Sequence, residues 1–215
     1  MNINRLVGIV CLLGALMSSI GCDSQPASKY PVDKPLPVFG VSKMVDGLLV
    51  QHSIPSFSFV NQDSNQVSEK DFDGKIYIAD FFFSTCPDIC PMMSAQMVRV
   101  YEAFEDNEKV AILSHSLDPE YDTPAVLKDY ASKLGVQAPK WNMVTGYSRR
   151  FISEFGQSNY LVTAKEDEGA PKGILHSGHF LLVDKDRKIR GLYDGTTERE
   201  VNMLIHDIKR LLNEE

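Results

Sequence analysis

In the stretch "KIYIADFFFSTCPDICPMM", residues 75–93, two cysteines stand between an apolar run and a predicted helix start. Residues 75–83 are mostly aromatic or β-branched, which is typical of a central strand covered on both faces. Pro91 suits the first turn of a helix, where a missing N–H costs nothing. We therefore place Cys86 and Cys90 at a strand-to-helix junction.

The rest of the chain alternates between strand and helix patterns. Strands are predicted at residues 57–60, 67–72, 109–113, 141–146, 179–184 and 188–195. Helices are predicted after Pro91, Thr123, Tyr147 and Thr197. This order predicts an α/β fold with a mixed central sheet flanked by helices and an N-terminal β-hairpin. A dithiol before the first main helix is where the thioredoxin fold carries its chemistry, so we predict a thioredoxin-like fold.

Composition sets limits on function. The chain has 215 residues, of which 43% are hydrophobic and 24% charged, so it can bury one ordinary domain core. Its formal net charge is −7. No broad nucleic-acid-binding surface is expected, because neutralising phosphates requires clustered Lys and Arg.

The first 22 residues are predicted to direct export. Arg5 precedes the apolar run "LVGIVCLLGALM", and small residues follow in "SSIGC". The apolar run is shorter than the ~20 residues that span a bilayer. "SIGC" resembles a bacterial lipoprotein box, which implies that residues 1–21 are a lipoprotein signal peptide and that Cys22 is lipidated. An uncleaved anchor and a plain secretory signal are the alternatives.

The segment that follows is predicted to be a tether, residues 22–48, because its first part is rich in Pro and polar residues and lacks helical periodicity. The folded domain is predicted at residues 49–215. Asp23 resembles an inner-membrane retention signal. We therefore expect the protein in the bacterial cell envelope, lipid-anchored to the inner membrane and facing the periplasm or the outside.

The domain is then expected to have two thiols, because Cys11 would lie in the signal peptide and Cys22 would carry lipid. Cys86 and Cys90 could form a structural disulfide, a redox-active pair or part of a metal site. A disulfide that closes so short a loop removes little chain entropy, which disfavours the first role. The start of a helix stabilises anions, so we predict thiol pKa values below the ordinary ~8.5. Two thiolates held together suit a soft cation such as Cu(I).

Three motifs, "CPDICP", "SLDPEYDTP" and "ILHSGHFLLVD", make the chain similar to the Sco/SenC family over about residues 50–213. That family consists of copper-binding, thioredoxin-like proteins that serve assembly of the CuA centre of cytochrome c oxidase. The resemblance implies that Cys86, Cys90 and His176 bind one copper per chain, as Cu(I) or Cu(II), with His176 at the start of a strand. Leu175 stands where relatives often carry an acid, so no carboxylate is expected to orient this imidazole.

The resemblance also implies a function and partners. The protein would be a copper metallochaperone for the copper-bearing subunit of cytochrome c oxidase, supplied by a copper donor chaperone or a thioredoxin-like reductant. Asp118 and Asp122 match family positions near the site and would support the ligands or dock a partner; a turn and a helix cap are the plain alternative. The alternative functions are a thiol–disulfide oxidoreductase that maintains client cysteines, with Cys86 and Cys90 as its dithiol, and a redox or copper sensor.

Other candidate ligands fit less well. A structural zinc site needs four ligands, and only His115 or His179 could supply the fourth. Met93 and Met97 fall on the inner face of the first helix, so core packing explains them better than copper binding. The charged stretch "AKEDEGAPKG", residues 164–173, is predicted to be a loop that could close His176 onto a metal.

Overall fold

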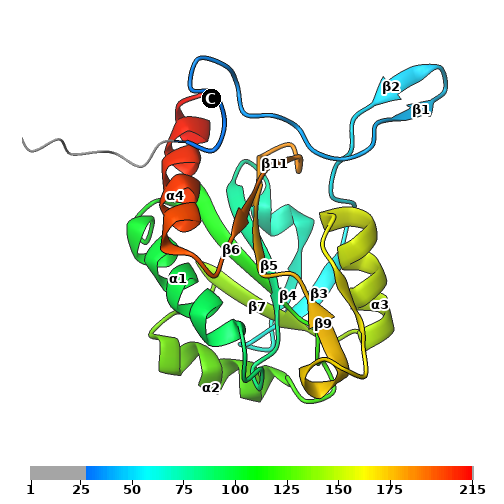
Figure 1. The fold of residues 1–215 in the computed structure, drawn as a ribbon, viewed down its shortest axis with the longest axis vertical. Helices are drawn as coiled ribbons and strands as arrows, with labels where there is room; N and C mark the ends of the chain where they lie inside the picture. The colour runs from blue at the N-terminus through cyan, green and yellow to red at the C-terminus, as the bar shows by residue number, and fades with distance from the viewer. Residues whose placement is uncertain (1–27, 215) are drawn as a thin grey trace, which may run out of the picture.

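The computed structural model describes residues 28–214, so the predicted signal peptide and Cys22 lie outside the described residues. One mixed sheet has seven strands. In order across it they are β11 (Ile189–Asp194), β10 (His179–Val183), β5 (Ile76–Phe82), β6 (Val110–Ser116), β7 (Trp141–Thr145), β3 (Ser58–Asn61) and β4 (Gln66–Ser68). β5, β6 and β7 are parallel to one another. Two further strands extend the sheet on each side, and each of them pairs antiparallel with its inner neighbour. The predicted α/β fold with a mixed central sheet is confirmed (Figure 1).

Helices cover both faces of the sheet (Figure 1). One face carries α1 (Cys90–Ala103), α2 (Pro124–Leu134) and α4 (Glu198–Asn213), and the other carries α3 (Arg149–Phe155) and the π-helix η2 (Gly156–Tyr160). Neighbouring residues of β5 contact the two layers, because the Phe82 ring packs on Tyr130 of α2 and the Phe81 ring on Tyr160 of η2. A 3-10 turn, η1 (Glu69–Phe72), follows β4. Within the described residues, no helix combines the length and apolar character needed to cross a membrane.

Capping contacts confirm the predicted ends of two helices. Thr123 Oγ1 accepts a hydrogen bond from Val126 N at the start of α2, and Thr197 Oγ1 accepts one from Glu200 N at the start of α4. Gly135 ends α2 with a φ of +73°. Glycine adopts this left-handed conformation without steric cost, which explains why the helix stops there.

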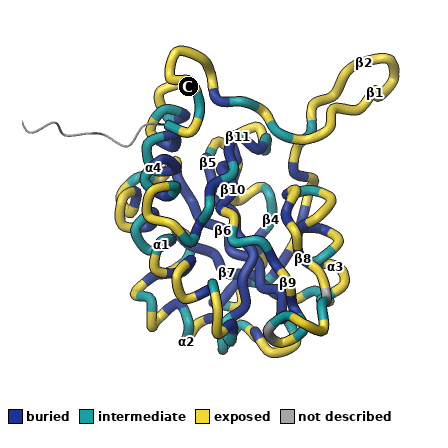
Figure 2. The backbone as a smooth tube through the Cα atoms, in the orientation of Figure 1, coloured by how far each residue is buried: buried dark blue, intermediate teal, exposed yellow. Residues whose placement is uncertain are grey.

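The core lies between the sheet and its helices (Figure 2). Every residue of β5 and β6 is buried, which explains their nearly continuous apolar sequences. Met93 and Met97 are buried on the inner face of α1, in agreement with their predicted packing role. The ends of β5 and β6 therefore give the cysteine-bearing segment a well-packed base.

The segment predicted to be a tether contains a further hairpin. β1 (Lys43–Val45) and β2 (Leu48–Val50) pair antiparallel. The two turn residues, Asp46 and Gly47, have φ values of +50° and +79°. Positive φ at both positions is typical of a type I′ turn, for which Asp-Gly is a favoured sequence. Asp46-Gly47 thus marks the hairpin in the sequence, whereas the Pro-rich residues before it favour an extended tether.

Another hairpin lies where the sequence predicted a charged loop. β8 (Ala164–Glu166) and β9 (Ile174–His176) pair outside the main sheet, with the 3-10 turn η3 (Pro171–Gly173) between them. His176 therefore ends β9. The expectation that it begins a strand is wrong, because β10 starts only at His179. Strands this short show too few alternating positions for the sequence pattern to reveal them.

Candidate metal centre

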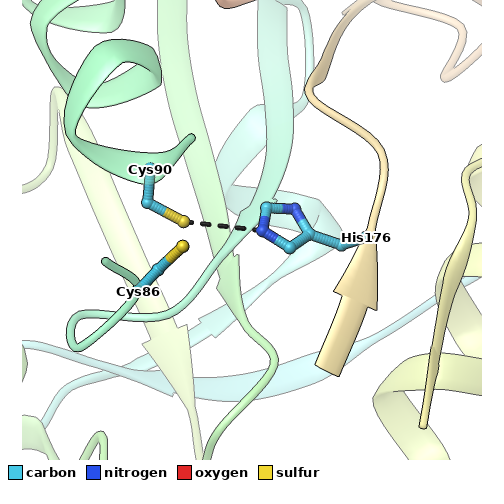
Figure 3. A group of neighbouring side chains, drawn as sticks. All are labelled: Cys86, Cys90 and His176. Atoms are coloured by element: carbon cyan, nitrogen blue, oxygen red, sulfur yellow. Dashed lines mark hydrogen bonds between the residues drawn. The ribbon is translucent and has the colours of Figure 1, made fainter. Parts of the chain in front are cut away.

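Three side chains from separate elements meet at one end of the sheet (Figure 3). Cys86 lies in the loop after β5, Cys90 is the first residue of α1, and His176 is the last residue of β9. Their sulfur and ring nitrogen atoms all lie within 4.8 Å of one another, and all three residues are buried. Among the described residues, this is the one group of at least three His, Cys, Asp or Glu side chains with a geometry that could hold a metal ion.

The local backbone explains why the two sulfurs converge. Cys86 N donates a hydrogen bond to Phe83 O at 3.1 Å, which turns the chain sharply after β5. Ile89 O accepts from Met93 N at 3.0 Å in the first turn of α1, and this turn brings Cys90 above the loop. Both cysteines are free thiols. The pair is thus held close without a covalent bond between the sulfurs.

The imidazole of His176 is oriented by the backbone. Its Nδ1 lies 3.3 Å from Ser177 O, and because a carbonyl only accepts hydrogen bonds, Nδ1 carries the proton. Nε2 lies 3.5 Å from Cys90 Sγ, so its lone pair faces the thiols. The ring also packs edge-on against Phe83, with centroids 5.7 Å apart. Leu175 has no carboxylate that could orient the imidazole. The backbone oxygen of Ser177 orients it instead.

Burial shifts the protonation equilibria at the site. It lowers the pKa of His176, which favours the neutral imidazole that a metal requires. Burial also raises the pKa of the Cys90 thiol, since only 1% of this residue is exposed. The predicted lowering of the pKa is therefore wrong for Cys90, because desolvation of the thiolate outweighs the favourable helix start. A cation that binds Cys90 must displace its proton.

Asp122 holds the chain just before Cys86. Its carboxylate accepts hydrogen bonds from Ser84 N at 3.1 Å, from Ser84 Oγ, and from Ser116 Oγ at 2.5 Å. Asp122 is fully buried, and this burial raises the pKa of its carboxyl. Its three donors come from the cysteine loop and from the end of β6. Asp122 therefore ties the loop to the sheet.

Asp118 lies beside this network and has a different partner. Its Oδ1 is 2.5 Å from Arg149 Nη2, at the start of α3. Its backbone N–H donates to Ser116 Oγ at 3.1 Å, so the hydroxyl of Ser116 links Asp118 to Asp122. The sequence singled out both aspartates but not Ser84 or Arg149. Ser84 and Arg149 lie 38 and 31 residues from the aspartates that they contact, and no sequence pattern links residues so far apart.

The remaining histidines lie outside the group. His115 is completely buried, its ring stacks on Phe81, and neither ring nitrogen has a hydrogen-bond partner. Burial lowers the pKa of His115 to about 3. His179 is exposed at the start of β10. Neither supplies the fourth ligand that a structural zinc site requires.

A small hollow gives access to the site. It has a volume of about 50 Å³ and is lined by Phe83, Cys86, Ile89, Ile174 and His176, among others. Its walls are mostly apolar, and its polar side chains are those of Cys86, Asp88 and His176. A partner could therefore approach the metal ligands from this side with little rearrangement of the core.

Known proteins share both the sequence pattern and the fold. The family model described as SCO1/SenC matches residues 47–213. A SCO1/SenC family lipoprotein from Bacillus anthracis is 32% identical with a TM-score of 0.69, over 75% of this chain and 95% of that chain. BsSco, described as a member of the Sco family of cytochrome c oxidase assembly proteins with a disulfide switch, is 33% identical with a TM-score of 0.67, over 76% and 95%.

A third structure, ScoI of Bradyrhizobium japonicum, was solved with copper bound. It is 26% identical with a TM-score of 0.60, over 74% of this chain and 99% of that chain. These neighbours confirm the thioredoxin-like assignment. Because the family model covers most of the chain and the folds agree, the chain belongs to the SCO1/SenC family.

Proposed function

We propose that this protein is a copper metallochaperone in cytochrome c oxidase assembly and that it carries one copper ion on Cys86, Cys90 and His176. The observation that carries the proposal is the convergence of two thiols and one imidazole within 4.8 Å. Two further findings support it. ScoI of Bradyrhizobium japonicum has copper bound, and BsSco belongs to a family of oxidase assembly proteins.

The donor set fits copper as a cargo. Thiolate sulfur prefers Cu(I), and imidazole nitrogen binds either oxidation state. With metal–ligand bonds of about 2.0–2.3 Å, as in zinc sites, donor atoms around one ion lie roughly 3.5–4 Å apart. The 3.5 Å from Cys90 Sγ to His176 Nε2 already meets that requirement. Three ligands also leave the ion open to a ligand of the recipient, as transfer by ligand exchange requires.

Asp122 and Asp118 support this role through hydrogen bonds to residues of the cysteine loop and of β6 rather than to the ligands themselves. We assign Asp122 to positioning of the cysteine loop, because its hydrogen bonds reach Ser84, two residues before Cys86. Asp118 is paired with Arg149 and linked to Asp122 through Ser116. The buried hydroxyls and carboxylates thus form one connected support under the thiols. A loop held in this way keeps Cys86 in place when the ion leaves.

Thiol–disulfide exchange is the second candidate, favoured by the two adjacent free thiols and by the disulfide switch of BsSco. In this reaction Cys86 and Cys90 would form a disulfide, while a client disulfide takes up two electrons and two protons and becomes two thiols. The same pair of residues would serve both activities, since loss of the metal leaves a dithiol that can be oxidised.

The proposed location and partners follow from the family and from the N-terminal sequence. We place the protein in a bacterial envelope, attached to the inner membrane through lipid on Cys22 and facing outward, with residues 1–21 removed, 22–48 as the connection and 49–215 as the domain. The lipoprotein from Bacillus anthracis supports the attachment. The recipient would be the copper-bearing oxidase subunit, and a copper donor chaperone or a thioredoxin-like reductant would load or reduce the site.

Copper titration of the reduced protein tests the main proposal. The native chain should bind about one Cu(I), and His176→Ala should weaken Cu(II) binding sharply while both thiols stay in place. His179→Ala is the matched control, because His179 is exposed and lies outside the ligand group. Unchanged copper binding in His176→Ala would remove the imidazole from the site.

The same variant separates the two candidate functions. His176→Ala keeps Cys86 and Cys90, so disulfide exchange with oxidised glutathione should continue at close to the native rate. In a strain that lacks the native gene, His176→Ala should fail to restore oxidase activity if copper delivery is the function. Full restoration would instead favour the exchange reaction.

A further inference from the structure

The β1–β2 hairpin exposes large apolar side chains to solvent. Met44, Leu48 and Leu49 are 66%, 71% and 68% exposed, and Val45 and Val50 are also exposed. β1 and β2 form a separate two-stranded sheet among the described residues. A two-stranded hairpin alone in water is marginally stable, and exposed apolar groups add no packing to it. Its composition therefore indicates a surrounding other than water.

Both faces of the hairpin are apolar. Val45 pairs with Leu48, and Met44 pairs with Leu49. Because successive residues of a strand point to opposite faces and paired residues share a face, these two pairs lie on opposite sides. A docked protein would cover one side of so thin a ribbon and leave the other in water. A lipid surface surrounds an inserted ribbon on both sides, which favours lipid as the occupant.

The hairpin lies at the end of the molecule opposite the metal centre (Figure 1). At its base, Phe39 N donates to Ile189 O and Ile54 N donates to Arg187 O, each at 2.8 Å. Arg187 lies in the turn between β10 and β11, and Ile189 is the first residue of β11, so both acceptors are next to the beginning of β5. The cysteines follow the other end of β5. The hairpin and the thiols are therefore separated by the full length of the central strand.

The chain enters the domain at this same end. Arg210, near the end of α4, donates hydrogen bonds to Pro31 O at 2.9 Å and to Lys34 O at 2.8 Å. The described chain begins only shortly before, at residue 28, and the sequence ahead of it contains the apolar run and Cys22. A membrane attachment through that sequence would bring the hairpin, rather than the metal centre, toward the lipid.

We propose that residues 41–50 insert into the surface of the membrane that holds the N-terminus, so that the metal centre points away from the lipid. Insertion would be shallow, because the outer edge of each strand carries backbone groups that have no partner in hydrocarbon. The hairpin is about 10–13 Å long, which suits the roughly 5–10 Å depth of an interfacial element. Lys43 and Asp46 cancel in charge, so neutral lipid suffices.

This inference rests on the proposed membrane attachment but not on copper binding. A single lipid chain gives only marginal attachment, and a second contact makes it stable. Insertion of the hairpin would supply that contact and would also restrict rotation of the domain. The metal centre would then face the outer compartment, where a recipient could reach it.

Tryptophan fluorescence in vesicles tests the insertion. Full-length Leu48→Trp is purified in detergent and reconstituted into phosphatidylcholine vesicles that contain lipid brominated at acyl positions 6 and 7 or 11 and 12. Trp141, the single native tryptophan, is 2% exposed and gives the background signal. Val32→Trp is the matched control, because Val32 is a 71% exposed apolar residue at the same end but outside the hairpin.

The Leu48→Trp signal should be quenched about twofold by the shallow bromines and less by the deep ones, as expected for an interfacial side chain. The quenching of Val32→Trp should stay close to that of the native chain, whose signal comes from Trp141 alone. Equal quenching of the two variants, or none, would overturn insertion. A blue shift of the tryptophan emission that grows with protein density, without quenching by the bromines, would show that the hairpin contacts a second copy of the chain. That result would overturn the proposal that lipid covers it.

Two controls separate this inference from the proposals on which it builds. Chain that fails to float with the vesicles overturns the membrane attachment and the hairpin inference together. A Leu48→Trp chain that floats while the fluorescence of its added tryptophan stays unquenched overturns the hairpin inference alone. Copper stoichiometry of Leu48→Trp should equal that of the native chain. That value also confirms that the variant has folded.

Discussion

The two arms of the metal centre are held by different kinds of contact. The thiol arm, residues 84–90, is tied to the main sheet by side-chain hydrogen bonds to the buried Asp122. The imidazole arm, residues 164–177, is a separate two-stranded hairpin outside the main sheet, and Gln157 of η2 donates a hydrogen bond from Nε2 to the backbone oxygen of Ala164 at 2.6 Å. The thiol arm is thus preorganised, whereas the imidazole arm can adjust as it closes on the ion.

This difference predicts an order of importance. The thiols should capture Cu(I) with little reorganisation, and the imidazole should complete the site afterwards. A substitution in the thiol arm, or in the residues that support it, should therefore weaken copper binding more than a substitution in the imidazole arm that is equally disruptive. The following variants test that order.

The largest effect is expected from Cys90→Ser. It replaces a soft sulfur donor with a hard hydroxyl, so Cu(I) affinity should fall by more than the roughly 10–100-fold typical of losing an outer partner. Competition with a Cu(I) chelator measures the change. Met97→Leu is the control, because Met97 is a buried sulfur on the same helix that the fold uses for packing. If both variants kept native affinity, the thiol arm would not hold the ion.

Loss of the buried carboxylate should have the next largest effect. Asp122→Ala removes the acceptor for Ser84 and Ser116, so we expect a loss of about 2–4 kcal/mol in the free energy of unfolding and about 10–100-fold in Cu(I) affinity. Urea unfolding and chelator competition measure the two quantities. Glu120→Ala is the matched control, since that carboxylate is 79% exposed beside the same network. Native affinity in a folded Asp122→Ala protein would mean that the thiol arm is not positioned by this contact.

His115 sharpens the comparison because it is a buried imidazole outside both arms. Burial lowers its pKa to about 3, so between pH 6.5 and 3 the unfolded chain takes up a proton that the folded chain excludes. Its contribution to the free energy of unfolding therefore falls by about 1.4 kcal/mol per pH unit on acidification. Burial raises the pKa of Asp80 to about 7, so between pH 7 and 3.8 the folded chain holds a proton that the unfolded chain has lost. The contribution of Asp80 to the free energy of unfolding therefore rises on acidification.

His115→Phe should uncover the contribution of Asp80. The variant removes an imidazole whose nitrogens have no partners and keeps an aromatic ring beside Phe81. Urea unfolding at a series of pH values should show that its stability, relative to the native chain, rises as pH falls from 6.5 to 4, by about 1.4 kcal/mol per pH unit. Copper affinity should stay native. A parallel pH profile for the two proteins would contradict the protonation argument.

The sequence predicted the thiol arm more fully than the imidazole arm, for physical reasons. The strand before Cys86 and the helix at Cys90 have long apolar patterns, and Pro91 marks the helix start. The imidazole arm consists of short strands without a readable period, so the sequence does not show that His176 ends a strand of its own. Its partner Ser177 O is a backbone atom, which any residue carries. The raised pKa of Cys90 also depends on tertiary burial, which local sequence does not contain.

The smallest effect should come from a strained turn in the imidazole arm. Gly173 has a φ of +71°, and a Cβ added there would meet nothing within 4 Å, so Gly173→Ala introduces backbone strain alone. We expect a cost of about 1 kcal/mol, and up to fivefold weaker Cu(II) binding if the strain loosens His176. Gly74→Ala is the matched control, because Gly74 has a φ of +70°, equal space and a place before β5, away from the site. Equal copper affinity in the two variants, with equal losses of stability, would show that the imidazole arm tolerates strain at its turn. A larger loss in Gly173→Ala than in Asp122→Ala would reverse the order of the arms, because the hairpin rather than the buried network would then set the geometry of the ligands.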